Sequence, residues 1–399
     1  MSNISKLYIT LLDLLSNALF DANKEIDLEN VDFKELFKES KQQTVCALAF
    51  DQLPASASEA YPEVYLAWQL YCLKVVQSNI SSFAANYELE KLLTNAGFPM
   101  CTIKGFSCAY YYPDSTLRQM GDIDFIIHKE KLKACENFLI SQGFVRADDD
   151  GDHDFHISFK KNQMLYEMHE RVTTFVDDAG YIEQYLQNVI ETAVEVEFDT
   201  GKMLIPDTFT HGLIMLLHMQ RHMISGGGIG LRHLCDFAVF VNAINNEDWI
   251  AMFSDKLKKV KLWKFAKVLG KISEKYLHVQ TKEWFVDADE ELVDQLLGDM
   301  ILAGNFGYKD KKRYQELAFV SRDVNHRGKV AGLFNSYINK VYSWSPAVKK
   351  HKVLLPFAMI AYPIRTAFLV IFKKKKVSFA ENLKSGSSRN DLYSKIFRN

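Results

Sequence analysis

Apolar residues recur at helical spacing over most of the chain, and this periodicity predicts helices toward both ends. Before residue 97 the periodic runs cover 4–20, 31–53 and 64–96. After residue 206 they cover 209–224, 230–243, 249–253, 262–277 and 292–302. Apolar positions three and four residues apart are typical of helices with one buried face. We therefore predict a helical region on each side of the middle of the chain.

The middle of the chain has a different pattern. Short β-like runs at 100–103 and 123–127 are separated by a helix-compatible segment, 106–112, and are followed by a helical run, 129–142, that stops at Gly143. Between residues 153 and 172 the chain alternates polar and apolar positions on either side of a polar turn. Such alternation predicts two further strands. We expect a small mixed β-sheet with helices.

These patterns predict an α+β fold in which a small α/β core lies between helical segments. The chain divides at its changes of pattern into an N-terminal helical region (1–96), the α/β core (97–205), a C-terminal helical domain (206–345) and a basic and apolar tail (346–399).

Composition fits an ordinary globular protein. The 399 residues are 48% hydrophobic and 25% charged, enough for two or three domains that each bury a core. The six cysteines form no C-x-x-C pair, so neither a zinc knuckle nor a disulfide framework is indicated. The first 27 residues have neither the basic start nor the cleavage site of a signal peptide. We expect a cytoplasmic protein.

The tail carries a charge opposite to that of the remaining chain. Residues 347–399 hold twelve Lys and Arg against two acidic residues, whereas the whole chain has a net charge of -2. Within the tail, an apolar run at 353–372 contains Pro356, Pro363 and Arg365 and precedes four lysines at 373–376. Two prolines and an arginine argue against a spanning helix. Residues 353–376 instead suggest contact with an anionic membrane surface, with nucleic acid as the alternative.

The candidate chemistry starts from Asp122 and Asp124, in the strand-like text Gly-Asp-Ile-Asp-Phe-Ile-Ile. Alternation along a strand points both carboxylates to one face, with their α-carbons about 7 Å apart. Two carboxylates at this spacing can share divalent cations. The pair is preceded by Lys104-Gly105 after a short apolar strand, by Tyr112-Pro113-Asp114 and by Arg118.

This combination of motifs resembles the polymerase-beta-like nucleotidyltransferases, and more closely an uncharacterised bacterial family within that superfamily. The resemblance covers roughly residues 99–240. It implies a nucleotidyltransferase-type fold, binding of a nucleoside triphosphate (NTP) with Mg²⁺ (or Mn²⁺), and in-line attack on the α-phosphate with release of pyrophosphate.

The resemblance also implies roles for residues near the start of the motif. Gly105 matches the glycine that lets the backbone approach the triphosphate at a helix start. The small residue that usually follows is replaced by Phe106, and Ser107 comes one position later. Lys104 and Arg118 would neutralise triphosphate charge, Arg118 through two parallel hydrogen bonds.

A third carboxylate comes from a later strand in this superfamily, where it holds metal and accepts the nucleophile's proton. Glu167 is the candidate, because alternation along the strand places its side chain on the same face as that of His169. The family also has a similar acidic-x-His sequence motif at this strand. Glu170 is the exposed alternative. Asp122, Asp124 and Glu167 are thus the predicted catalytic and metal-binding residues, with His169 as an accessory.

A histidine-containing helix followed by Leu231-Arg-His-Leu-Cys-Asp236 also resembles this family. It makes Arg232 and Asp236 accessory candidates. Alternatively, Arg232 and Asp236 form a structural ion pair, because the two residues lie four positions apart on one helix face.

Three functions stay open at the level of sequence. The first is an enzyme that transfers a nucleoside monophosphate to an acceptor: a sugar, a lipid-linked sugar, a protein or an RNA. The second is a catalytically inactive fold of the same type that binds a nucleotide or partner, suggested by the altered Gly-Phe-Ser text. The third is a peripheral component of surface-polysaccharide assembly at the inner membrane face, suggested by residues 353–376.

Overall fold

The computed structural model describes residues 4–147, 156–173, 175, 177, 179–310, 313, 337–338, 341–342, 344–345, 348, 351–372 and 379–397. Its α+β fold is the one expected from the sequence pattern. Two compact units account for the chain. The first comprises residues 1–219 and 231–294, and the second comprises 220–230 and 295–399. The four-part division of the sequence stays a prediction.

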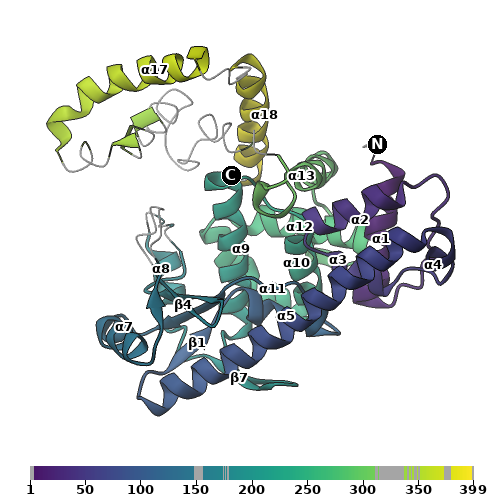
Figure 1. The fold of residues 1–399 in the computed structure, drawn as a ribbon, viewed down its shortest axis with the longest axis horizontal. Coiled ribbons are helices and arrows are strands. Elements are labelled where there is room, and N and C mark those ends of the chain that lie inside the picture. Colours follow the sequence, from purple (N-terminus) through teal and green to yellow (C-terminus); the bar gives the residue numbers. More distant parts are fainter. Residues whose placement is uncertain are drawn as a thin grey trace. The chain divides into compact units, whose positions relative to one another are not determined.

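Helices begin the first unit, ahead of the sheet (Figure 1). They are α1 (Lys6–Phe20), α2 (Phe33–Gln42), α3 (Cys46–Asp51), α4 (Ser56–Ala60) and the long α5 (Pro62–Asn95). Helix α5 starts with a proline in its first turn, where no amide donor is lost, and is followed by Gly97 at φ +78°. The periodic run 31–53 is interrupted between α2 and α3, where Thr44 has a left-handed backbone.

A five-stranded mixed sheet follows in the order β1-β2-β5-β4-β3. The strands are β1 (Met100–Thr102), β2 (Ile123–Ile127), β3 (Val145–Arg146), β4 (His156–Lys161) and β5 (Met164–His169). Strands β2 and β5 are parallel, and the other neighbours are antiparallel. Asn162 and Gln163 both have positive φ in the two-residue β4–β5 turn, as hairpin turns of this length prefer.

Short helices connect the strands, and a separate hairpin closes this region. The connections are α6 (Gly105–Ala109), the 3-10 turns η1 (Ser115–Leu117) and η2 (Lys129–Lys131), and α7 (Leu132–Ser141). Beyond the sheet lie α8 (Tyr181–Leu186) and the hairpin of β6 (Val194–Phe198) and β7 (Gly201–Ile205). Helix α5 contacts β1 and β7 (Figure 1). It also contacts η1. Their shared core includes Phe83, Phe106 and Phe125, all buried.

Helices dominate again after the hairpin. They are α9 (Thr208–Ser225), α10 (Leu231–Asn242), α11 (Asn246–Lys259), α12 (Trp263–Leu277), η3 (Glu283–Phe285) and α13 (Glu290–Ala303). Helix α10 is buried along almost its whole length and contacts α12, α1 and α6. This burial matters for function, because α10 carries Arg232 and Asp236.

The second unit contains the glycine-rich segment 226–230, η4 (Asn305–Gly307), η5 (Lys352–Leu354), α17 (Leu355–Phe372) and α18 (Phe379–Phe397). A Cβ atom added at Gly227 would lie 2.6 Å from the Gly307 α-carbon, so the two glycines permit a close backbone approach. Pro363 lies inside α17. None of the helices that the structure describes combines the length and hydropathy that crossing a bilayer requires. The lysine run 373–376 lies outside the described residues.

Candidate nucleotide and metal site

Three carboxylates meet at the adjoining strands β2 and β5. Asp122 comes directly before β2, Asp124 lies within it, and Glu167 lies in β5. The parallel register pairs Asp124 with Glu167, so both side chains leave the same face of the sheet. One carboxylate oxygen from each of Asp122, Asp124 and Glu167 falls within 4.8 Å of the other two. The three predicted catalytic residues are therefore brought together.

Two alternatives for the third carboxylate separate clearly. Glu167 belongs to the cluster, whereas Glu170 lies after the end of β5 and pairs with Lys129 at 2.9 Å. His169, two residues after Glu167, is fully buried, and its Nε2 lies 2.7 Å from Asp124 Oδ1 and 3.5 Å from Glu167 Oε2. The alternation predicted for Glu167 and His169 is thus present.

The pKa shifts of the clustered carboxyl groups favour binding of a cation. The neighbouring charge of Asp124, helped by burial, raises the pKa of Asp122 against the opposing effect of Lys104. For Glu167 burial acts to raise the pKa, but the hydrogen bond with His169 and the charge of Lys104 outweigh it and the pKa is lowered. Crowded carboxylates that repel one another are relieved by a divalent cation, and oxygen ligands suit Mg²⁺ and Mn²⁺.

Lys104 supplies the positive charge at this cluster. Its backbone has φ +58° and ψ −117°, a conformation that side-chain-bearing residues rarely adopt, at the junction between β1 and α6. The ammonium pairs with Asp124 and lies 3.2 Å from His169 Nε2 and 3.8 Å from Glu167 Oε2. The residue predicted to neutralise triphosphate charge therefore lies among the carboxylates.

The Gly-Phe-Ser segment after Lys104 makes its contacts within the fold. Helix α6 is five residues long. The Ser107 hydroxyl is buried and donates to the Lys104 carbonyl at 2.9 Å, while Phe106 packs edge-on against Phe83 at 5.2 Å in the core. A Cβ atom at Gly105 would lie 3.4 Å from Arg118 Nη1. The phosphate roles of Gly105 and Ser107 stay predictions.

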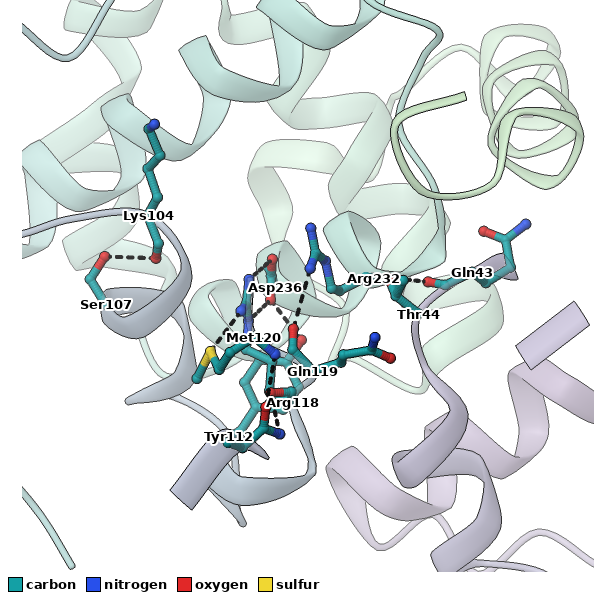
Figure 2. Close-up of polar contacts among 11 residues, drawn as sticks. Gln43, Thr44, Lys104, Ser107, Tyr112, Arg118, Gln119, Met120, Arg232 and Asp236 are labelled. Atoms are coloured by element: carbon teal, nitrogen blue, oxygen red, sulfur yellow. Dashed lines mark hydrogen bonds and ion pairs between the residues drawn. The ribbon is translucent and has the colours of Figure 1, made fainter. Parts of the chain in front are cut away.

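Arg118, predicted to donate two hydrogen bonds to phosphate, makes its contacts with another carboxylate in the structure. Its Nε and Nη2 each donate to the Asp236 carboxylate at 2.7 Å, and the Tyr112 hydroxyl donates to the same group at 2.7 Å (Figure 2). Burial acts to raise the pKa of Asp236, but Arg118 outweighs it and the pKa is lowered. The sequence suggested an ion pair between Arg232 and Asp236; in the structure Arg118 makes the two hydrogen bonds to this carboxylate, and the charge of Arg232 adds to the lowering of its pKa. The phosphate role of Arg118 stays a prediction.

The segment that leads into Asp122 is held from two helices. Arg232 Nη1 of α10 donates to the Gln119 carbonyl at 3.2 Å (Figure 2). Asn79 of α5 donates to the carbonyls of Thr116 and Arg118, at 2.6 and 3.0 Å, and accepts from the Met120 amide at 3.0 Å. Sequence reasoning missed Asn79. Its signal was a polar residue on the buried side of an otherwise apolar helical pattern.

His156 was also missed as a site residue. It starts β4 directly opposite His169, and its Nε2 lies 3.6 Å from Glu167 Oε1. The signal was the text His-x-Ser, which the predicted hairpin sets opposite Glu-x-His. The described arrangement thus combines three carboxylates, two imidazoles and one ammonium, a set able to bind a cation and a polyanion carried by it.

Comparison with known proteins assigns a family. A family model described as "Uncharacterised nucleotidyltransferase" matches residues 29–278, more than half of the chain and a span that contains every site residue named above. No curated protein matches the chain.

Proposed function

Because this chain belongs to the uncharacterised nucleotidyltransferase family, we propose that it transfers a nucleoside monophosphate from an NTP to a hydroxyl or phosphate of an acceptor. The observation that carries this proposal is the meeting of Asp122, Asp124 and Glu167 within 4.8 Å on adjoining strands. Pyrophosphate would be the second product. The acceptor is proposed by class only, as a sugar, a lipid-linked sugar, a protein or an RNA.

The residues of the chain have distinct parts in this proposal. Asp122, Asp124 and Glu167 would hold Mg²⁺ or Mn²⁺, which supplies charge neutralisation at the phosphate oxygens. Glu167 has a lowered pKa and is therefore ionised at neutral pH, so it is also able to accept a proton from the acceptor hydroxyl. Lys104 is the cation nearest to these carboxylates and would move onto the triphosphate as the site loads.

Arg118 and Asp236 enter the proposal as positioning residues. Their buried pair fixes the segment that ends at Asp122, and Arg232 fixes the Gln119 carbonyl within the same segment. Correct placement of reacting groups contributes strongly to catalysis, and small displacements cost rate.

Transfer of label tests the proposal. Full-length protein would be mixed with each α-³²P-labelled NTP, Mg²⁺ and a cell extract, and labelled acceptor would be separated from NTP. We expect Asp122→Asn and Asp124→Asn to lower the labelling rate at least about a hundredfold, because a bound cation contributes several kcal/mol at such a centre.

Glu170→Gln is the matched control, since Glu170 pairs with Lys129 outside the cluster. It should label as the wild type does. Equal labelling by wild type and Asp122→Asn would disprove the assignment.

An inactive binding module is the second candidate. It is favoured by the engagement of Arg118 with Asp236 and of Ser107 with the Lys104 carbonyl, which leaves the expected phosphate donors committed elsewhere. Calorimetric NTP binding with micromolar affinity, without label transfer to any acceptor in the extract, would support this module over the enzyme.

Attachment to an anionic membrane surface from the cytoplasmic side is a separate proposal for α17. One stripe of this helix carries Phe357, Ile360 and Ile364, each at least 65% exposed. The opposite side, with Ala358, packs against Val341 and Val348. Four lysines at 373–376 follow in the sequence and match an anionic headgroup in charge.

Flotation with vesicles tests this attachment. Wild-type protein should float with phosphatidylglycerol vesicles at low salt, and the triple variant Phe357→Ser/Ile360→Ser/Ile364→Ser should not. Leu302→Ser, a change at an exposed leucine of α13, is the control and should float. Equal flotation of the triple variant and wild type would remove the basis for this proposal.

A further inference from the structure

Strand β4 places a histidine beside the carboxylate cluster, which creates a second group of possible metal ligands. His156 is the direct cross-strand partner of His169, and Glu167 precedes His169 by two residues on β5. Directly opposite residues and residues two apart leave the same face of a sheet. Two imidazoles and one carboxylate are thereby gathered on the face that carries Asp124.

The spacing of these donors suits a small divalent cation. Glu167 Oε2 lies 3.5 Å from His169 Nε2, and Glu167 Oε1 lies 3.6 Å from His156 Nε2. One donor atom from each of the three residues falls within 4.8 Å of the other two. Tetrahedral coordination with the usual zinc–nitrogen and zinc–oxygen bond lengths separates donor atoms by about 3.3 Å. The structure therefore needs little movement to close around such an ion.

Burial and orientation support the same conclusion. The side chains of His156, Glu167 and His169 are 4%, 16% and 0% exposed. The Asp124 carboxylate lies 2.7 Å from the same His169 Nε2, so an ion bound at this nitrogen would also meet an oxygen donor. The ammonium of Lys104 lies 3.8 Å from Glu167 Oε2 and 3.2 Å from His169 Nε2, so it would move away from these donors as a metal ion binds.

We propose that His156, Glu167 and His169 form a binding site for a zinc-class divalent cation, next to the Mg²⁺ site proposed at Asp122, Asp124 and Glu167. Imidazole nitrogen favours zinc and its neighbours in the first transition series, whereas Mg²⁺ prefers oxygen ligands. Glu167 is common to both groups and would link the two cations. The inference goes beyond the proposed transfer reaction, because this binding requires neither nucleotide nor acceptor.

Cobalt(II) is the probe that tests this site. Metal-free full-length protein would be titrated with Co²⁺, whose visible absorption bands report four-coordinate binding, followed by displacement with Zn²⁺. We expect one equivalent of Co²⁺ to give these bands. His156→Ala should bind Co²⁺ at least about a hundredfold more weakly, because loss of an outer partner of a metal ligand alone costs about 10–100-fold.

A gain of signal covers the case in which His156→Ala folds poorly. His156→Cys should keep Co²⁺ binding and add the near-ultraviolet band of a cobalt–thiolate bond, because position 156 would then supply sulfur. The wild type should lack this band, since its six cysteines are buried and, among the described residues, none belongs to either donor group.

Two control variants separate this site from other metal binding. His128→Ala removes a histidine near Glu191 that belongs to neither group of donors, and should leave the Co²⁺ spectrum unchanged. Asp122→Asn should lose label transfer yet retain the spectrum, so that failure of the transfer proposal and failure of this one are distinguishable. An unchanged Co²⁺ affinity in His156→Ala, or loss of the spectrum in Asp122→Asn, would overturn the inference.

Discussion

Asp236 is a buried carboxylate that binds three donors from the segment before the site, two from Arg118 and one from Tyr112. Removing one partner of such a pair leaves an uncompensated buried charge. We expect Asp236→Asn to lower the free energy of unfolding by about 3–5 kcal/mol. Urea denaturation at pH 7 measures the loss.

Asp255→Asn provides the matched control, because the Asp255 side chain is 92% exposed. Its effect should stay within about 0.5 kcal/mol. A double change, Arg118→Met with Asp236→Leu, should destabilise less than the sum of its single changes, since no buried charge is then left alone. Equal stability of Asp236→Asn and wild type would contradict the structural role assigned to the pair.

His211 gives the pH dependence of stability a defined sign. Burial lowers the pKa of this histidine to about 4, and its ring lies 5.2 Å from Tyr111 and 4.9 Å from Phe240. The unfolded chain, with an ordinary pKa near 6.5, takes up the proton first as pH falls. Stability is therefore lost between about pH 6.5 and pH 4, by about 2 kcal/mol at pH 5 from this group.

His211→Gln should remove that part of the loss, because the amide does not titrate in this range. The measurement is urea denaturation of wild type and variant at pH 7.5 and pH 5, taking the difference between the two pH values for each protein. Parallel losses in both proteins would show that His211 does not carry the effect.

At the scale of elements, α5 holds the segment between η1 and β2 through Asn79. Asn79→Ala would leave one buried carbonyl, one part-buried carbonyl and one part-buried amide without this partner, at a cost of about 2–4 kcal/mol in unfolding free energy. Because the segment ends at Asp122, we also expect the labelling rate to fall about tenfold to a hundredfold. Denaturation and the labelling assay measure the two effects.

Ser81→Ala on the same helix is the control for Asn79→Ala. The Ser81 side chain is exposed and bonds back to Gln77 of α5 itself. Its substitution should change neither stability by more than about 0.5 kcal/mol nor labelling. Normal labelling by Asn79→Ala would show that Asp122 is positioned without this helix.

The elements that carried strong periodicity were predictable from sequence. Helix α5, strand β2 and the β4–β5 hairpin follow from apolar spacing. The grouping of Glu167 with Asp124 was predicted from the family resemblance, and the parallel β2–β5 register accounts for it. The β6–β7 hairpin was missed, although Val-Glu-Val-Glu-Phe alternates, because its five-residue strands carry a weak signal beside long helices. The break between α2 and α3 was missed because a left-handed threonine has no sequence signature.

The partners of buried charges were not predictable. Spacing along α10 offered Arg232 for Asp236, but the bond to Arg118 spans 118 positions and depends on how α10 packs. His156 and Asn79 belong to the same class, since each acquires its role from a contact across strands or helices. Local patterns fix which face a side chain takes, whereas tertiary packing decides what it meets.

At the scale of the whole molecule, helix α18 in the basic tail packs within the second unit. In α18, Arg389, Tyr393 and Phe397 are buried. The Tyr393 hydroxyl donates to Asp299 of α13 at 2.8 Å, and Arg389 donates to the Gly227 carbonyl at 3.4 Å. The sequence analysis placed these residues in different regions because the bonded partners lie up to 162 positions apart, whereas the second unit joins them.

The Asp299 carboxylate pairs with two arginines of the second unit. Its Oδ1 lies 2.7 Å from Arg313 Nη2 and 3.9 Å from Arg389 Nε. We expect Asp299→Asn to lower the free energy of unfolding of the second unit by about 3–5 kcal/mol, because two buried guanidinium groups lose their counter-charge. Tyr393→Phe, which removes one hydrogen bond, should cost about 1 kcal/mol. Thermal unfolding followed by calorimetry resolves the graded loss.

Deletion of residues 379–399 distinguishes a docked helix from a free tail. If α18 packs as described, the deletion exposes the apolar surface that covers Tyr393 and Phe397 and lowers the unfolding temperature at least as far as Asp299→Asn does. Ser388→Ala, at an exposed position of α18, should leave that temperature unchanged. An unfolding temperature unaffected by the deletion would mean that α18 contributes nothing to the second unit. Membrane experiments could then use a protein without the tail. If the temperature falls, those experiments require the point variants in α17.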